Sequence, residues 1–110
     1  MLFKEFEVGG RTYKLAMNTR SVIELEKKMG CNPIAVFGDG DRVPTVTDMI
    51  NILSAALQRF EHGLTQNDAI SIFDTWLDEG HNIAEFIPVI LDVYKVSGLI
   101  SSENEEAAKN

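Results

Sequence analysis

Alternating apolar residues near the start of the chain predict a β-hairpin. Residues 3–8 alternate in polarity, which places Phe6 and Val8 on one side of a strand. Gly9 and Gly10 supply a two-residue turn that tolerates positive φ. The residues expected to share one face of the second strand are Tyr13, Leu15 and Met17. Because a lone hairpin is only marginally stable in water, it must pack on the helices or pair with another chain.

A first helix is predicted over residues 20–29. Thr19 can cap its N-terminus and Gly30 can end it, since glycine adopts the left-handed conformation that closes helices. Its predicted buried stripe comprises Val22, Leu25 and Met29. Residues 33–37 are predicted to form one short helical turn, because Pro33 suits a first helical position. Residues 38–42 are polar and glycine-rich, and a loop is expected there.

The clearest amphipathic pattern predicts a helix that begins at Thr45 or Thr47 and reaches His62. Its apolar residues recur at intervals of three and four, namely Val46, Met49, Ile50, Leu53, Leu57 and Phe60. Gly63 is the predicted stop, and Thr65 with Asp68 can form a capping box for the next helix, at about residues 66–79. The residues expected to be buried on that helix are Ala69, Ile70, Phe73, Trp76 and Leu77.

The last predicted helix, residues 83–96, has apolar residues on nearly every side. Gly80 ends the preceding helix, and Asn82 with Glu85 can cap this one. One stripe contains Ile83, Phe86, Ile87 and Ile90, while Val89, Leu91 and Val93 lie off it. Such a helix is either central in the core or covered by a partner. Pro88 lacks the amide that a helix interior needs, so a kink or a restart is expected there.

Together these elements predict an α+β, mainly helical fold, in which an N-terminal β-hairpin packs on a bundle of four or five helices. The 110 residues fit one domain, predicted at residues 1–100, followed by a polar tail at 101–110 that is expected to be disordered. The residues expected to be most buried are Leu15, Val22, Leu25, Leu53, Leu57, Phe60, Phe73, Trp76 and Ile90.

Composition narrows the function classes. The net charge of −7 disfavours direct binding to nucleic-acid phosphates. Cys31 is the only cysteine, so no internal disulfide can form. No apolar run approaches the roughly 18 residues that a membrane span needs, and no signal peptide is apparent. These observations predict a cytoplasmic protein that is not bound to membranes.

The sequence gives little support for catalytic or metal-binding residues. His62 and His81 each lie beside a glycine that is predicted to end a helix, where a histidine interacts favourably with the helix dipole. The sequence Asp39-Gly40-Asp41 lacks the further oxygen ligands of a calcium loop. No nucleophile with a paired base is apparent. We therefore expect no enzymatic activity, no cofactor and no metal.

Four stretches resemble one protein family. Residues 19–33, TRSVIELEKKMGCNP, resemble the ELEKKLG-x-NP stretch of small tail assembly chaperones from long-tailed (siphovirus-type) phages and prophages of low-GC Gram-positive bacteria. AALQ at 55–58 with HGLT at 62–65, LDEG at 77–80 and VSGL at 96–99 resemble further stretches of that family in the same order. The resemblance covers roughly residues 3–100 and consists mostly of caps and apolar positions.

The resemblance implies a non-enzymatic role in the host bacterial cytoplasm. Such chaperones bind the long, helical tape-measure protein, keep its apolar surfaces soluble and help to recruit tail-tube subunits, and they are absent from the finished virion. On this basis Phe86, Ile90 and Tyr94 are predicted to anchor the client, because they follow helical spacing on the most apolar helix. The alternative is that all three are ordinary core residues. Excess apolar surface on that helix and the hairpin edge also predicts a homo-oligomer.

Two other classes of function remain open. One is an acidic phage- or prophage-encoded regulatory protein that binds a DNA-binding partner, which would gather carboxylates on one face, whereas here they are scattered over the helices. The other is a small enzyme, which would need a pocket with convergent polar groups.

Overall fold

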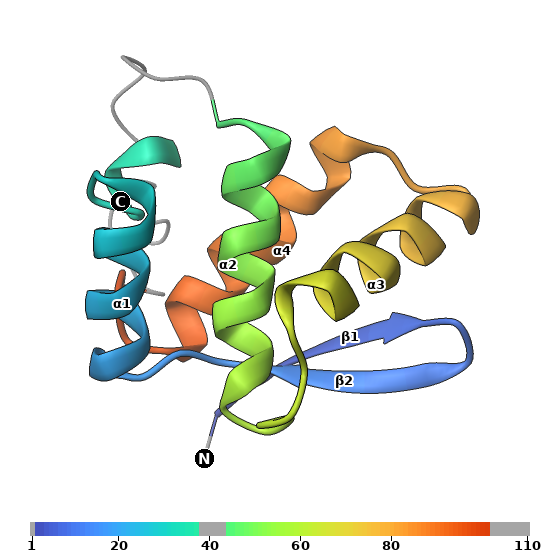
Figure 1. The fold of residues 1–110 in the computed structure, drawn as a ribbon, viewed down its shortest axis with the longest axis horizontal. Coiled ribbons are helices and arrows are strands. Elements are labelled where there is room, and N and C mark those ends of the chain that lie inside the picture. The colour runs from blue at the N-terminus through green and yellow to red at the C-terminus, as the bar shows by residue number, and fades with distance from the viewer. Residues whose placement is uncertain (1, 38–43, 102–110) are drawn as a thin grey trace, which may run out of the picture.

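The computed structural model describes residues 2–37 and 44–101. Within these ranges an antiparallel hairpin precedes four α-helices, which confirms the predicted α+β, mainly helical fold (Figure 1). The elements are β1 (Lys4–Val8), β2 (Arg11–Leu15), α1 (Thr19–Met29), the 3-10 turn η1 (Ala35–Phe37), α2 (Val46–Gln58), α3 (Gln66–Asp78) and α4 (Ile83–Val96). The loop predicted at 38–42 and all but the first residue of the predicted tail lie outside the described residues.

The hairpin has the geometry that its glycines predict. Gly9 and Gly10 have φ values of 60° and 77°, the pair of positive angles that a type I′ turn requires. Val8 therefore pairs with Arg11 across the turn, and the register continues to Lys4 opposite Leu15. The turn is fixed to the end of α3, because the Gly9 amide donates to the Glu79 carboxylate at 3.0 Å.

Side-chain caps define where the helices begin. Thr45 and Asp48 form a capping box on α2, which settles the choice between Thr45 and Thr47. The predicted boxes at the starts of α3 and α4 are both present. The predicted cap of α1 is one residue late, because the Asn18 side chain, not that of Thr19, accepts from the amide of Ser21 at 2.9 Å.

One predicted helix end differs from the structure. Gly30 and Gly80 have positive φ, as expected, but Gly63 does not. Helix α2 ends at Gln58 instead of His62. The Leu57 carbonyl accepts from the amides of both Phe60 and Glu61, so the backbone leaves α-helical bonding in a tight turn before Gly63.

Helix α2 is the centre of the fold. It packs against α1, α3, α4 and β2, and Figure 1 shows it between α1 and α3 with α4 crossing behind. The hairpin covers α3 and α4 through β1, and the ring of Phe6 lies 5.6 Å from that of Trp76 and 5.7 Å from that of Phe86. One continuous apolar cluster thus joins the hairpin to the helices.

Most of the predicted core is confirmed. The residues that are both predicted and buried are Leu15, Leu25, Leu53, Leu57, Phe73, Trp76 and Ile90. Val22 and Phe60 are only half-buried, so their predicted deep burial is wrong. Helix α1 packs mainly on α2, which covers a narrow line of its surface. Phe60 follows the end of α2, and its ring lies edge-on to Phe3 at 5.9 Å.

Two residues assigned to buried stripes are exposed. Val46, in the first turn of α2, is 46% exposed, and Ile70 of α3 is 42% exposed. The buried line of α3 runs through Ala69, Ile72, Phe73 and Trp76, a spacing that fits a helix as well as the predicted one did. Helix α3 is therefore turned about its axis so that Ile72 takes the place expected for Ile70.

Helix α4 passes through Pro88 as one helix, so the predicted restart is wrong. A proline at this position cannot donate to the carbonyl of Ala84 four residues earlier. Both residues are exposed, so water can satisfy that carbonyl and the helix continues.

Candidate functional site

The three predicted client anchors lie in the core. Phe86, Ile90 and Tyr94 are 1%, 1% and 0% exposed. Phe86 is surrounded by rings, with centroid distances of 5.0 Å to Phe73 and 5.5 Å to Trp76. In this structure they present no surface to a partner, and their burial matches the core role that the sequence left as the alternative. The protein's own hairpin and helices thus cover the face of α4 that carries Phe86, Ile90 and Tyr94, while Ile83 is 41% exposed and Val89 is only half-buried.

Tyr94 is a structural hydrogen-bond donor. Its hydroxyl donates to the carbonyl of Pro33 at 2.8 Å and so connects α4 to the segment after α1. Burial raises the pKa of the Tyr94 hydroxyl well above its ordinary value of 10, and Cys31 and Asp48 act in the same direction. The hydroxyl therefore stays protonated and cannot serve as a base near neutral pH.

The described residues contain no cluster of side chains that could bind a metal ion. They include no group of three or more His, Cys, Asp or Glu side chains placed to hold a metal ion. His81 stacks flat on Trp76, with ring centroids 4.4 Å apart, and its Nδ1 lies 3.4 Å from the Glu85 carboxylate. His62 is exposed at the surface. Neither histidine thus belongs to a group of side chains that could hold a metal ion.

A small polar cleft between α1, α2 and the start of α3 has a volume of about 300 Å³. Lys28 donates to the Gln66 side chain at 3.0 Å, and Gln66 donates to the buried Asn51 at 2.7 Å. Gln58 donates to the carbonyl of Leu64. These polar groups bond to one another, so most of the polar lining of the cleft is used in contacts between helices.

An apolar groove opens between α2 and α3, and we call it the α2–α3 groove. It has a volume of about 260 Å³ and is lined by Val46, Thr47, Ile50, Gln66, Ile70, Phe73 and Asp74. Buried Ile50 and Phe73 contribute its inner apolar surface, while Val46 and Ile70 are the two exposed aliphatic residues of its lining. Exposed branched aliphatic side chains around an apolar depression are typical of protein-binding sites.

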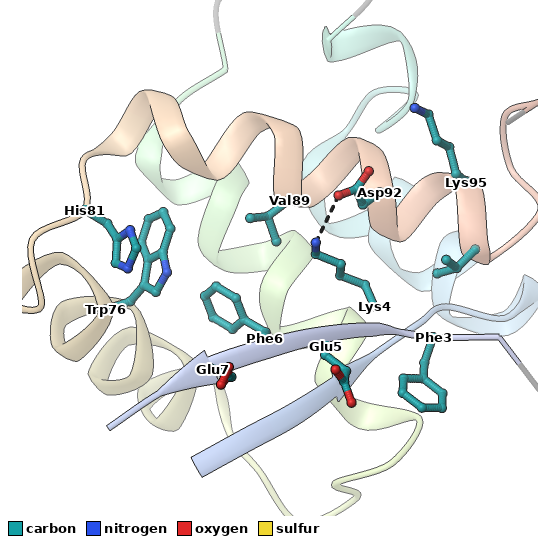
Figure 2. A pocket seen from close by; sticks show the side chains of 11 residues that line it. Phe3, Lys4, Glu5, Phe6, Glu7, Trp76, His81, Val89, Asp92 and Lys95 are labelled. Atoms are coloured by element: carbon teal, nitrogen blue, oxygen red, sulfur yellow. Dashed lines mark ion pairs between the residues drawn. The ribbon is translucent and has the colours of Figure 1, made fainter. Parts of the chain in front are cut away.

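A second, wider groove lies between β1 and α4, and we call it the β1–α4 groove (Figure 2). It has a volume of about 1070 Å³, and its lining includes Phe6 from β1 and Val89 from α4. An ion pair crosses it, since Lys4 Nζ lies 3.0 Å from Asp92 Oδ2. Trp76 and His81 lie at one end of the groove in Figure 2, and Phe3 lies at the other.

Sequence reasoning missed both grooves. Val46 and Ile70 fit the helical period of a buried stripe, so their exposure depends on the rotation of each helix, which the period alone does not fix. The sequence of α3 does contain a second apolar stripe, through Ile72 and Phe73, that would leave Ile70 exposed to solvent.

The fold and these surfaces define a small, mainly helical α+β domain with two open grooves. None of the helices in the described ranges combines the length and apolarity needed to cross a membrane. The chain belongs to the family described as "Family of unknown function (DUF6096)", whose profile matches residues 2–110. Comparisons with curated proteins and with solved structures gave no significant match.

Proposed function

We propose that this protein is a non-enzymatic tail assembly chaperone of a phage or prophage, which binds the tape-measure protein and keeps it soluble in the host cytoplasm. In this role it helps to recruit tail-tube subunits and leaves before the virion is complete. The resemblance of residues 19–33, 55–58 with 62–65, 77–80 and 96–99 to tail assembly chaperones supports this proposal.

The structural observation that supports this function best is the α2–α3 groove. A client helix presents apolar side chains at intervals of three and four, and such side chains dock into apolar grooves between helices. Val46 and Ile70 offer exposed apolar area next to the deeper Ile50 and Phe73. The groove is small enough to receive one or two aliphatic side chains of the client at a time, which suits reversible holding.

The negative charge of the protein also supports binding of a client in the α2–α3 groove. Asp74 lies in the groove lining, and the whole chain carries a net charge of −7. A negative rim attracts clients with basic residues beside their apolar positions and mainly accelerates encounter. Self-association through remaining open surface stays a prediction of this function.

The test is co-expression of the full chain with the tape-measure protein encoded beside it. We expect the client to be soluble and to co-purify with the wild-type protein. The double variant V46S/I70S removes exposed apolar area without opening the core, so it should fold normally and lose the client. The matched control is I23S, because Ile23 is 45% exposed but lies on α1, outside the groove.

The outcomes separate the function from its site. A client that is equally soluble alone and never co-purifies contradicts the chaperone function. A client that binds wild type and V46S/I70S equally well leaves the function in place and contradicts the α2–α3 groove as its site. Equal loss in I23S and V46S/I70S also contradicts that site, because the effect is then not local.

A further inference from the structure

The outer edge of β1 has unpaired backbone groups. In the hairpin, Val8 and Arg11 flank a two-residue turn, which makes them a hydrogen-bonded pair of the ladder. Antiparallel ladders alternate, so Phe6 and Lys4 also bond to β2, while the amides and carbonyls of Glu5 and Glu7 point the other way. The sheet of the described residues has two strands, and no further strand covers this side of β1.

The space beside this edge is a groove that is bounded on its other side by α4. The β1–α4 groove is lined by every residue from Phe3 to Glu7, so it follows the strand along its length. From α4 it is lined by Val89, Asp92 and Lys95, which are labelled in Figure 2, and by Val96. Val89 and Val96 are seven residues apart, or two helical turns, and so lie on the same side of α4. Asp92, which pairs with Lys4, lies between them, so α4 offers an added strand one apolar contact on either side of this ion pair.

The side chains at the edge of β1 determine which charge favours pairing of another strand with it. Glu5 and Glu7 are exposed on the face of β1 opposite to Phe6. Neither carboxylate makes a hydrogen bond or ion pair within residues 2–37 and 44–101. Residues opposite one another on adjacent strands interact, and like charges there are destabilising. Pairing of β1 with β1 of a second copy about Phe6 would place Glu5 opposite Glu7 twice, so the edge disfavours its own copy.

We propose that the β1 edge binds an extended, basic segment of a partner protein as a third strand of the sheet. The segment alternates Lys or Arg with aliphatic residues. Its basic side chains lie opposite Glu5 and Glu7, and its aliphatic side chains enter the β1–α4 groove over Val89 and Val96. Backbone hydrogen bonds to Glu5 and Glu7 supply affinity, and the alternation supplies specificity. This site is separate from the α2–α3 groove and does not depend on the tail chaperone function.

The first test uses a fluorescent peptide, acetyl-Lys-Val-Lys-Val-Lys-Val-Lys-amide, and measures its anisotropy with the full-length protein. We expect saturable binding of this peptide and none of the analogue with Glu in place of Lys. A peptide of the same composition with its lysines and valines in two blocks should bind much more weakly. Absence of binding by the alternating basic peptide, or equal binding by the blocked one, overturns the proposal.

The second test changes the charge of the edge. The variant E5K/E7K should weaken binding of the basic peptide roughly tenfold or more, because two attractive cross-strand pairs become repulsive. The same variant should gain binding of the Glu peptide. The matched control is E24K/E26K, which changes net charge equally at two exposed positions of α1 and should change the affinity less than about twofold. Equal weakening in both variants shows a response to net charge alone and contradicts the site.

The third test examines the backbone with the wild-type protein and so does not depend on the folding of any variant. In an added strand, alternate amides face β1 and the others face away. Methylation of one alternate set of peptide nitrogens should abolish binding, and methylation of the other set should be tolerated. Equal effects of the two sets contradict strand addition.

Discussion

Replacing Tyr94 with Phe isolates one buried hydrogen bond. The hydroxyl donates to the Pro33 carbonyl at 2.8 Å, and both residues are fully buried. Phe keeps the ring, which lies 6.2 Å from that of Phe37, and leaves the carbonyl without this partner. An unsatisfied buried acceptor costs about 1–3 kcal/mol. For 110 residues, at roughly 2.1 cal/mol/K of unfolding entropy per residue, this lowers Tm by about 4–13 °C.

The assay is chemical and thermal unfolding of the variant beside wild type, with Tyr13→Phe as the matched control. Tyr13 is half-buried and its hydroxyl makes no hydrogen bond within the described residues, so its variant should change stability by less than about 0.5 kcal/mol. If Tyr94→Phe costs no more than Tyr13→Phe, the bond to Pro33 does not stabilise the fold, and the reasoning is refuted.

Because the pKa of Tyr94 is raised in the folded state, the stability of the fold should depend on pH in the alkaline range. The folded state keeps the Tyr94 proton to higher pH than the unfolded state, whose pKa is near 10. Above about pH 10 the unfolded chain therefore binds fewer protons, so this group's contribution to stability falls by at most about 1.4 kcal/mol per pH unit. Below that pH the contribution is fully present. Tyr94→Phe should lack this part of the alkaline loss, and identical pH profiles for variant and wild type would contradict the assignment.

Three further substitutions, two of them compared with a matched control, test the fold. Leu53→Ala should lower the free energy of unfolding by about 2–5 kcal/mol, because Leu53 is 1% exposed in the central helix, and a loss under about 0.5 kcal/mol in urea melts would contradict its place in the core. Thr45→Ala should cost about 0.5–2 kcal/mol by breaking the capping box, whereas Thr47→Ala should be nearly neutral; the reverse order in thermal melts would move the start of α2. Gly30→Ala should cost about 1–2 kcal/mol because φ is +71°, while Gly63→Ala, which has equally open space for a Cβ, should be neutral or slightly stabilising; equal losses would mean that left-handed backbone is not the cause.

Local signals in the sequence were enough to predict the elements of the fold. The Gly9-Gly10 turn and the caps at Thr65 and Asn82 each depend on side chains within a few residues, and all are present in the structure. The end of α2 was predicted less well. Gly63 was expected to end the helix, but the helix ends earlier, where the Leu57 carbonyl accepts hydrogen bonds from the amides of Phe60 and Glu61. A helix end formed by backbone bonding leaves little trace in residue types.

The grooves depend on rotation and packing, which the sequence does not specify locally. Apolar residues on nearly every side of α4 predicted either a central core helix or a helix covered by a partner. In the structure, β1 packs on α4, and Phe6 of β1 contacts Phe86. The period of α3 allowed Ile70 or Ile72 to face inward, and contacts with α2 and β1 decide between them. The edge of β1 could be foreseen only as an open strand, since the floor beneath it comes from α4, far along the chain.

The hairpin is fixed by residues that are synthesised long after it. Gly9 bonds to Glu79, Met17 bonds to Ser97 and Lys4 pairs with Asp92, so each contact joins residues 70 or more positions apart. Because an isolated hairpin is marginal in water, β1 and β2 have little reason to persist before α3 and α4 leave the ribosome. Contacts of such long sequence separation slow folding. During this interval the apolar side of the hairpin has no cover, so the nascent chain passes through a period in which it can itself aggregate or need a chaperone.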